Sequence, residues 1–235
     1  GVIDSDFQDE PDPTLWCVRD DGKLIGFSYE RTQEVEGWHR HTLGGINSAV
    51  KSLCCIPKPT SNGDDLWMIV SRTIAGATVQ TIEYMYDYFS PDLNGKESAY
   101  FVDCGSTYDG RLASTLTAGA VSGSSVTFTA GSSVFTAGMV GSQIRYGLSR
   151  ALITGYTSGT VVTCSISVDF PDTATIESGD WSVAIKNVTG LSWLDGELVA
   201  VCADGYYAGD KTVSSGGFSL DDFATIIHAG LPYIA

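Results

Sequence analysis

Two histidines are the first candidates for chemistry in this chain. His39 and His41 are separated by one residue, so on an extended strand both side chains project from one face and could supply two ligands to zinc. A zinc site needs three or four ligands, and the remaining histidine, His228, is brought near by no spacing in the sequence. We therefore interpret the two histidines as a cross-strand polar pair beside Trp38, and we expect no bound metal.

Adjacent aspartates are the second candidates, because two carboxylates can share the acid and base roles of a glycosidase. The pairs are Asp20–Asp21, Asp64–Asp65 and Asp221–Asp222. Each pair is predicted at a turn or just before a strand, where aspartate forms local hydrogen bonds with the backbone. We therefore favour a structural role for all three pairs.

An acidic run near the start of the chain resembles a loose calcium loop. Its members are Asp4, Asp6, Asp9, Glu10 and Asp12. The run lacks the glycine at the sixth position and the glutamate at the twelfth that give such a loop its turn and its bidentate ligand. We interpret it as a solvated acidic arm.

Aromatic side chains could bind sugars or a protein partner. A sugar platform could be built from four tryptophans, namely Trp16, Trp38, Trp67 and Trp193. Tryptophans that recur at the spacing of a structural repeat are more often core residues. Tyr84, Tyr86 and Tyr88 share one face of an extended segment, which would give an aromatic strip for a protein partner.

The sequence carries none of the common enzyme motifs. Gly-x-Ser-x-Gly, Gly-x-x-x-x-Gly-Lys-Ser/Thr, Gly-x-Gly-x-x-Gly and His-Glu-x-x-His do not occur. We therefore expect a protein that is not an enzyme, with no catalytic residues, no cofactor and no cofactor-binding residues.

Composition narrows the class further. The chain has 235 residues, 43% of them hydrophobic, which is enough for a buried core. A net charge of −15 opposes binding to nucleic-acid phosphates. No apolar run approaches the roughly 20 residues of a membrane span, and residues 1–12 do not resemble a signal peptide. Because the first residue is Gly, we expect this chain to be part of a longer one.

The six cysteines are expected to be free thiols. Their density is far below that of small secreted scaffolds stabilised by disulfides. Cys54 and Cys55 are adjacent on an extended segment, where a bridge between them would be strained. Free thiols indicate assembly in a reducing compartment.

Strand and turn signals dominate the chain, so we predict an all-β fold. Four extended segments, Leu15–Arg19, Lys23–Tyr29, Gly37–His41 and Ala49–Ile56, occupy about the length of one propeller blade. The one weak helix candidate is Leu220–Ile227. The prediction is a partial β-propeller-like body of short antiparallel strands.

A repeat supports this body and defines an insert. Trp67 follows Trp16 by 51 residues, and each tryptophan opens a strand, so we expect both to be buried at matching positions. Trp193 restores the period only if residues 112–187, which are poor in charge, are removed. We predict a body of residues 1–111 and 188–235, interrupted by a small β-barrel or sandwich domain at 112–187.

The flanking segments resemble the tail hub and nozzle proteins of short-tailed bacteriophages. The resemblance covers both flanks in order, and its signature residues are Leu15, Trp16, Arg19, Asp21, Gly22, Tyr29, Trp38, His41, Trp67, Arg72, Glu83, Gly190, Leu191, Gly196, Asp204, Gly205, Gly230, Leu231, Pro232 and Tyr233. Members of that family are longer and close a complete ring of blades, whereas this chain holds about three blade-equivalents. We expect either an excised part or a minimal member.

The insert is similar to small β-domains of phage proteins that are likened to the first-catalytic-cysteine half-domain of ubiquitin-activating enzymes. The similarity lies in Gly123–Phe128, Phe135, Met139–Gly141, Ile144 and Ile153–Thr154. No adenylate-binding loop or catalytic cysteine context accompanies it, so the likeness implies no activity.

The resemblance implies a structural subunit of the virion tail, assembled in the bacterial cytoplasm, that joins copies of itself and neighbouring tail proteins in a ring. DNA would pass through this ring without specific binding, because an acidic lumen repels the duplex. The alternative is an adhesin or carbohydrate-binding module whose Ser/Thr-rich insert contacts a host glycan. A glycan hydrolase that uses the acidic pairs is a third hypothesis.

Overall fold

A computed structural model describes residues 1–30, 34–59, 63–87, 89–90, 92 and 95–233. Within these ranges the chain forms eighteen strands and three 3-10 turns, and every strand pairing is antiparallel. None of the sheets in the described parts closes into a barrel. The prediction of an all-β fold is therefore confirmed.

The first sheet has the order β1-β2-β3-β4. Its strands are β1 (Val2–Gln8), β2 (Thr14–Arg19), β3 (Leu24–Glu30) and β4 (Val35–His41). The expectation of a solvated acidic arm is wrong for β1, which pairs with β2 from Val2 to Gln8. The alternation of Asp4, Ser5, Asp6 and Phe7 fits a strand with one polar face turned inward.

The second sheet has the order β5-β6-β7. Its strands are β5 (Ile46–Pro57), β6 (Asp64–Ile74) and β7 (Ala77–Tyr84). The segment predicted as the fourth strand of the first sheet is thus part of β5 and begins the next sheet. The two sheets share one core, which joins Trp16, Val18 and Leu24 to Leu66 and Met68.

The third sheet has the order β16-β15-β18-β8. Its strands are β8 (Asp103–Asp109), β15 (Leu198–Ala203), β16 (Tyr206–Thr212) and β18 (Ile226–Leu231), with the short turn η1 (Lys96–Ser98) before β8. This sheet therefore combines segments from both sides of the insert.

A seven-stranded sheet with the order β17-β14-β11-β12-β13-β10-β9 carries the insert. Its elements are β9 (Leu116–Ala118), β10 (Val126–Ala130), η2 (Ala137–Met139), β11 (Gln143–Tyr146), β12 (Ser149–Ser158), β13 (Val161–Val168), β14 (Trp181–Thr189) and β17 (Gly217–Ala224). Fifteen buried residues, from Leu116 to Val183, form a core for this part of the chain alone.

Strand β14 belongs to both parts. Trp181 to Ala184 pair with β11 of the insert, whereas Ile185 to Thr189 pair with β17, which follows the insert in sequence. The predicted boundary at residue 187 therefore cuts through paired strand, and the change of partner lies between Ala184 and Ile185. The division into body and insert stays a prediction, now with this junction.

Two local predictions are wrong. The helix candidate Leu220–Ile227 is the end of β17 and the start of β18, because its apolar side chains pack between sheets instead of along one helical face. The repeat also implies a strand at Leu191–Trp193, but Trp193 lies in the 3-10 turn η3 (Ser192–Leu194). Strand β15 begins only at Leu198.

The prediction that Trp16 and Trp67 are buried at matching positions is also wrong. Trp16 is 5% exposed in the shared core, but Trp67 is half-buried on the other face of its sheet. Successive side chains of a strand point to opposite faces, and in β6 it is Leu66 and Met68 that face the core. Arg72 is buried whereas Arg19 is exposed, so these two arginines are not equivalent either.

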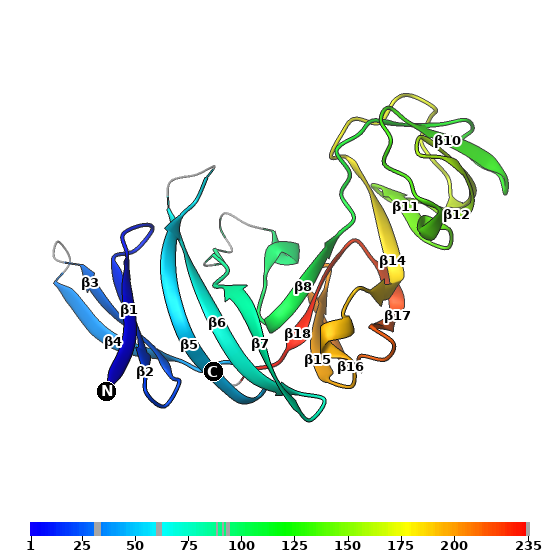
Figure 1. The fold of residues 1–235 in the computed structure, drawn as a ribbon. Helices are drawn as coiled ribbons and strands as arrows, with labels where there is room; N and C mark the ends of the chain where they lie inside the picture. The colour runs from blue at the N-terminus through cyan, green and yellow to red at the C-terminus, as the bar shows by residue number, and fades with distance from the viewer. Residues whose placement is uncertain (31–33, 60–62, 88, 91, 93–94, 234–235) are drawn as a thin grey trace.

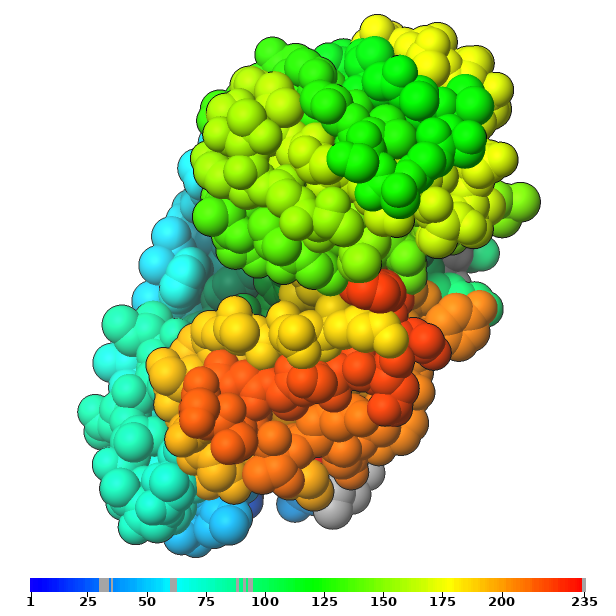
Figure 2. Space-filling view, turned by 90° about the vertical axis from the view of Figure 1, so that its right-hand side faces the viewer, coloured from blue at the N-terminus to red at the C-terminus, as the bar shows by residue number. Residues whose placement is uncertain are grey.

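The sheets lie in an open row, with the first sheet at one end and the insert projecting at the other (Figure 1). Figure 2 shows the insert stacked above the third sheet and β17, and in contact with them. The architecture thus leaves the first sheet with a neighbour on one side only.

Candidate functional site

A groove of about 630 Å³ lies where the first three sheets meet. Residues Thr81–Tyr84 of the edge strand β7, the edge strand β8 and the end of β4 line it, together with Tyr100 and Tyr233. Three of the signature residues line it, namely His41, Glu83 and Tyr233. Arg72 on β6 is the ion-pair partner of Glu83.

A buried ion pair forms the floor of this region. Arg72 on β6 is 1% exposed and makes a bidentate pair with Glu83 on β7, with 2.9 Å between Nη2 and Oε2. The Nε group of Arg72 also donates to the carbonyl of Gly44 at 2.8 Å. Removing one partner of such a pair leaves a buried charge without compensation, so the pair locks β6, β7 and the β4–β5 connection together.

The signature residues Leu231 and Pro232 lie next to the same connection between β4 and β5. Gly44 approaches the C-terminal segment so closely that a Cβ atom there would lie 2.7 Å from the carbonyl oxygen of Pro232. Leu231, which is buried, packs beside Gly45 and Arg72. Two segments that lie far apart in sequence are therefore joined here, and only a residue without a side chain fits at Gly44.

Burial is the largest cause of the pKa shifts of the titratable groups around the groove. Burial raises the pKa of the Asp103 carboxyl, although that carboxylate accepts the N–H of Gly44 and lies near Arg72. Burial and the nearby charge of Glu83 raise the pKa of the Cys104 thiol to about 11, and burial raises the pKa of Tyr100 as well. A thiol with so high a pKa is a poor nucleophile at neutral pH.

The histidines lie in two separate places. His39 and His41 face the core side of β4, where Nδ1 of His39 is 2.8 Å from Nε2 of His41. Both rings pack on Trp16, at centroid distances of 5.5 and 5.0 Å. The predicted position beside Trp38 is wrong, because Trp38 lies between them in sequence and points to the other face.

Space for the His39 ring comes from Gly26, where a Cβ atom would lie 2.2 Å from its Cε1. His228 belongs to the third sheet and is held by Thr107 and by the carbonyl of Glu97, each at 2.8 Å. Among the residues that the structure describes, no three metal-ligating side chains gather at one point. The structure thus gives the histidines packing and hydrogen-bonding partners.

The acidic residues serve as links between sheets. Asp4 accepts the N–H of Leu53 at 3.0 Å, and Asp6 accepts the N–H of Cys55 at 2.7 Å. Because β5 is an edge strand, these two carboxylates of β1 satisfy backbone donors that its own sheet leaves open. Asp64 likewise accepts the N–H of Asp9 at 2.9 Å.

The adjacent aspartates are not grouped with one another. Asp20–Asp21 lies in the β2–β3 turn, where Asp20 pairs with the N-terminal amine. Asp64–Asp65 opens β6, and Asp65 lies 3.5 Å from Lys58. The expected turn position is wrong for Asp221–Asp222, which lies inside β17.

The remaining signature residues shape turns and sheet faces. Gly22 turns the chain after Asp21, and its carbonyl accepts the N–H of Val50 at 2.9 Å. Leu15, Tyr29 and Trp38 lie on the outer face of the first sheet, with Tyr29 and Trp38 exposed.

Around β15 the signature residues are also structural. Leu191 is buried between the turn glycines Gly190 and Gly196, and Gly230 packs against Gly105 of β8. Of the predicted tyrosine strip, Tyr84 and Tyr86 lie with their rings 6.5 Å apart, and Tyr88 lies outside the described residues.

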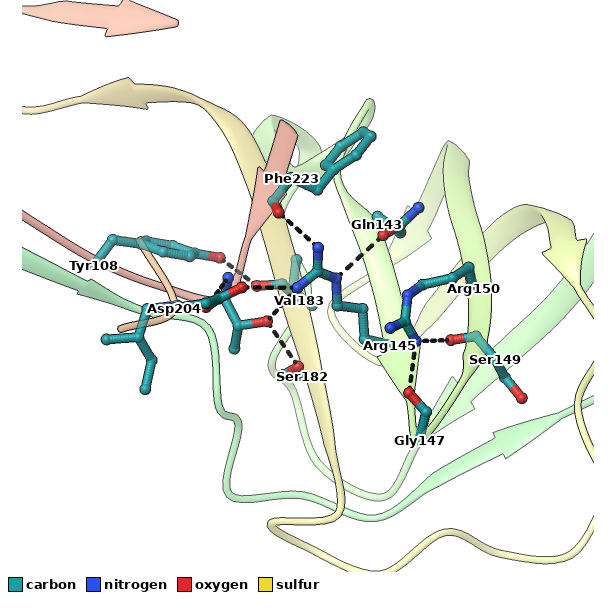
Figure 3. A network of polar contacts seen from close by, with 12 residues as sticks. Tyr108, Gln143, Arg145, Gly147, Ser149, Arg150, Ser182, Val183, Asp204 and Phe223 are labelled. Atoms are coloured by element: carbon teal, nitrogen blue, oxygen red, sulfur yellow. Dashed lines mark hydrogen bonds and ion pairs between the residues drawn. The ribbon is translucent and has the colours of Figure 1, made fainter. Parts of the chain in front are cut away.

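A polar network joins the insert to the rest of the chain (Figure 3). Arg145 of β11 donates to Asp204 Oδ2 at 2.9 Å and to the carbonyl of Phe223 at 2.6 Å. Asp204, next to the turn glycine Gly205, also accepts the N–H groups of Thr225 and Ile226 at 2.8 Å each. Sequence reasoning named Asp204 and Gly205 but missed Arg145, which is one of only two arginines within residues 112–187.

Comparison with known proteins identifies no family for this chain. A scan against protein-family models and a search of curated proteins return no match to this chain. In the described ranges, no helix has the length and apolar character needed to span a membrane. The site must therefore be interpreted from its own geometry.

Proposed function

We propose that this chain is a non-enzymatic structural subunit of a bacteriophage tail, and that copies of it form part of a ring through which DNA leaves the virion. The observation that carries the proposal is the junction at Gly44, where Arg72, Glu83 and Leu231 from distant segments meet in a buried contact. Three residues of the phage-like pattern thus hold successive sheets together, which is what a rigid assembly component needs.

The electrostatic character supports the same role. The net charge of −15 would repel a passing duplex and keep it from adhering to the lumen. The titratable groups at the groove are engaged in internal contacts, with Arg72 paired to Glu83 and Asp103 bonded to Gly44. They serve to hold the scaffold.

Localisation in virions tests the proposal. An antibody raised against this chain should label the tails of purified particles of the phage that encodes it, and image reconstruction of those tails should place several copies around one axis. Particles that lack the protein, or that carry one asymmetric copy, would contradict it. Specific binding on a glycan array by the isolated insert would favour the adhesin instead.

A further inference from the structure

Two apolar sheet faces point away from the shared core of the first two sheets. On the first sheet, Phe7, Leu15, Phe27 and Trp38 are direct cross-strand neighbours and form one row over all four strands. The rings of Phe27 and Trp38 are 4.9 Å apart, and Trp38 is 62% exposed. We call this row, with Tyr29 beside it, the first outer face.

The second sheet has a similar outer surface. Trp67 and Tyr84 are cross-strand neighbours with ring centroids 5.2 Å apart, and Ile69 and Ile82 form the next pair. Ile82 is 75% exposed and Tyr84 is 49% exposed. We call these residues, together with Ile56, the second outer face.

We propose that the first outer face of one copy docks on the second outer face of the next copy, in a head-to-tail contact. This inference rests on the proposed role as a ring subunit and names the surfaces that would join the ring. Because different patches meet, the contact is heterologous, and such contacts close into rings when the rotation between subunits permits.

The area of the two faces supports a second copy as the occupant. An aromatic side chain offers roughly 150–250 Å² of surface, so half-exposed rings and aliphatic side chains leave on the order of 400 Å² of apolar surface per face. That is about half of the ~800 Å² that each partner contributes to a standard interface, and a polar rim supplies the remainder. Both faces are single-sheet surfaces, so docking would repeat the sheet-on-sheet packing already present around Trp16 and Leu66.

Charge restricts where two copies can meet. Each copy carries a net charge of −15, so copies repel one another over most of their surface. An apolar contact adds no charge repulsion of its own, and added salt should strengthen it by screening the repulsion between the two copies.

Two variants, each alone and then mixed, test the proposal by sedimentation equilibrium. Trp38→Glu breaks the first outer face and Ile82→Glu breaks the second. Each should fold, since the side chain replaced is exposed, and circular dichroism checks this. Leu148→Glu is the matched control, because Leu148 is 86% exposed at the β11–β12 turn of the insert, outside both faces.

We expect the unaltered chain and Leu148→Glu to associate more strongly as concentration and salt rise. Each face variant alone should lose association by about tenfold or more in Kd. A mixture of the two variants should form a one-to-one dimer that grows no further, since each retains the face that the other has lost.

Three outcomes would overturn the contact. They are a monomeric unaltered chain at its highest soluble concentration in high salt, self-association by Ile82→Glu alone, and a mixture that stays monomeric. Failure of the tail role is a separate result, because a chain that associates through these faces yet is missing from virion tails refutes only the proposed function. Binding to a glycan array that Trp38→Glu abolishes would assign the first outer face to a sugar.

Discussion

The insert and the rest of the chain are stabilised in different ways. The insert has one core of fifteen buried residues and carries few charges. In the described parts of the flanking segments, two smaller cores hold twelve and eight buried residues. Hydrogen bonds from backbone N–H groups to carboxylates link the sheets around these smaller cores. For example, Glu197 accepts the N–H of Ala75 at 2.7 Å. A small core is thus supplemented by ionised side chains that hydrogen-bond the backbone of a neighbouring sheet.

Removing the insert is the largest change and tests whether the body folds without the core of the insert. Deletion of residues 112–184 with a short Gly-Ser bridge keeps Ile185 to Thr189, which pair with β17, so the body should stay soluble and unfold cooperatively. Deletion of residues 112–187 also removes paired backbone and should lower the denaturation midpoint further. Urea unfolding followed by circular dichroism compares the two. An insoluble product from the shorter deletion would show that the parts share one core.

Substitution of the buried arginine should be the strongest point change in the body. Arg72→Ala leaves the carboxylate of Glu83, which is 15% exposed, without its buried partner and should cost about 3 kcal/mol of unfolding free energy. The exposed Arg19→Ala is the matched control and should cost less than about 1 kcal/mol. Equal losses in the two variants, measured by urea unfolding, would mean that the ion pair does not hold the junction.

The carboxylate links of β1 should have a smaller effect. Asp4→Ala and Asp6→Ala each leave one backbone N–H of the edge strand β5 without its acceptor and should cost about 1–3 kcal/mol. Asp12→Ala, at an exposed position outside the strands, is the control. If all three variants have the same melting temperature as the unaltered chain, the difference in stabilisation between body and insert lies in their cores alone.

Acidification should weaken the body and spare the insert, because all three histidines lie outside residues 112–187. Burial lowers the pKa of His41 and of His228 in the folded chain. The unfolded chain then binds more protons, so stability is fully present above the unfolded pKa of about 6.5 and declines as pH falls below it. Melting of the unaltered chain and of His41→Gln between neutral and mildly acid pH measures this, and a reduced pH dependence in the variant is expected.

The exposed thiol of Cys54 should react faster than the other five thiols of the folded protein. All six cysteines are free, as the sequence predicted, but only Cys54 is exposed. Burial raises the pKa of Cys164 in the insert to about 12, and burial together with Asp6 and Asp64 raises that of Cys55 to about 12. A disulfide reagent should modify Cys54 first in the native protein and all six thiols in denaturant. Cys54→Ser should remove the fast phase.

The sequence alone determined the all-β character, the β2–β3 hairpin, the free thiols and the low charge of residues 112–187. These features depend on local signals, namely alternation of apolar side chains, turn glycines such as Gly22, and a change in composition. The resemblance to phage tail proteins identified Arg72, Glu83 and Asp204 as residues of interest without indicating their partners.

Only the tertiary structure decided which face each strand buries and which segments meet. A shift of one residue moves a side chain to the opposite face, so the Leu-Trp pattern places Trp16 in the core and Trp67 outside it. The acidic run became a strand because Asp4 and Asp6 find donors on β5, about fifty residues away, and local propensity carries no information at that separation. The meeting of Gly44 with Pro232 has the same origin, since long-range contacts depend on the packing of whole sheets and not on sequence neighbours.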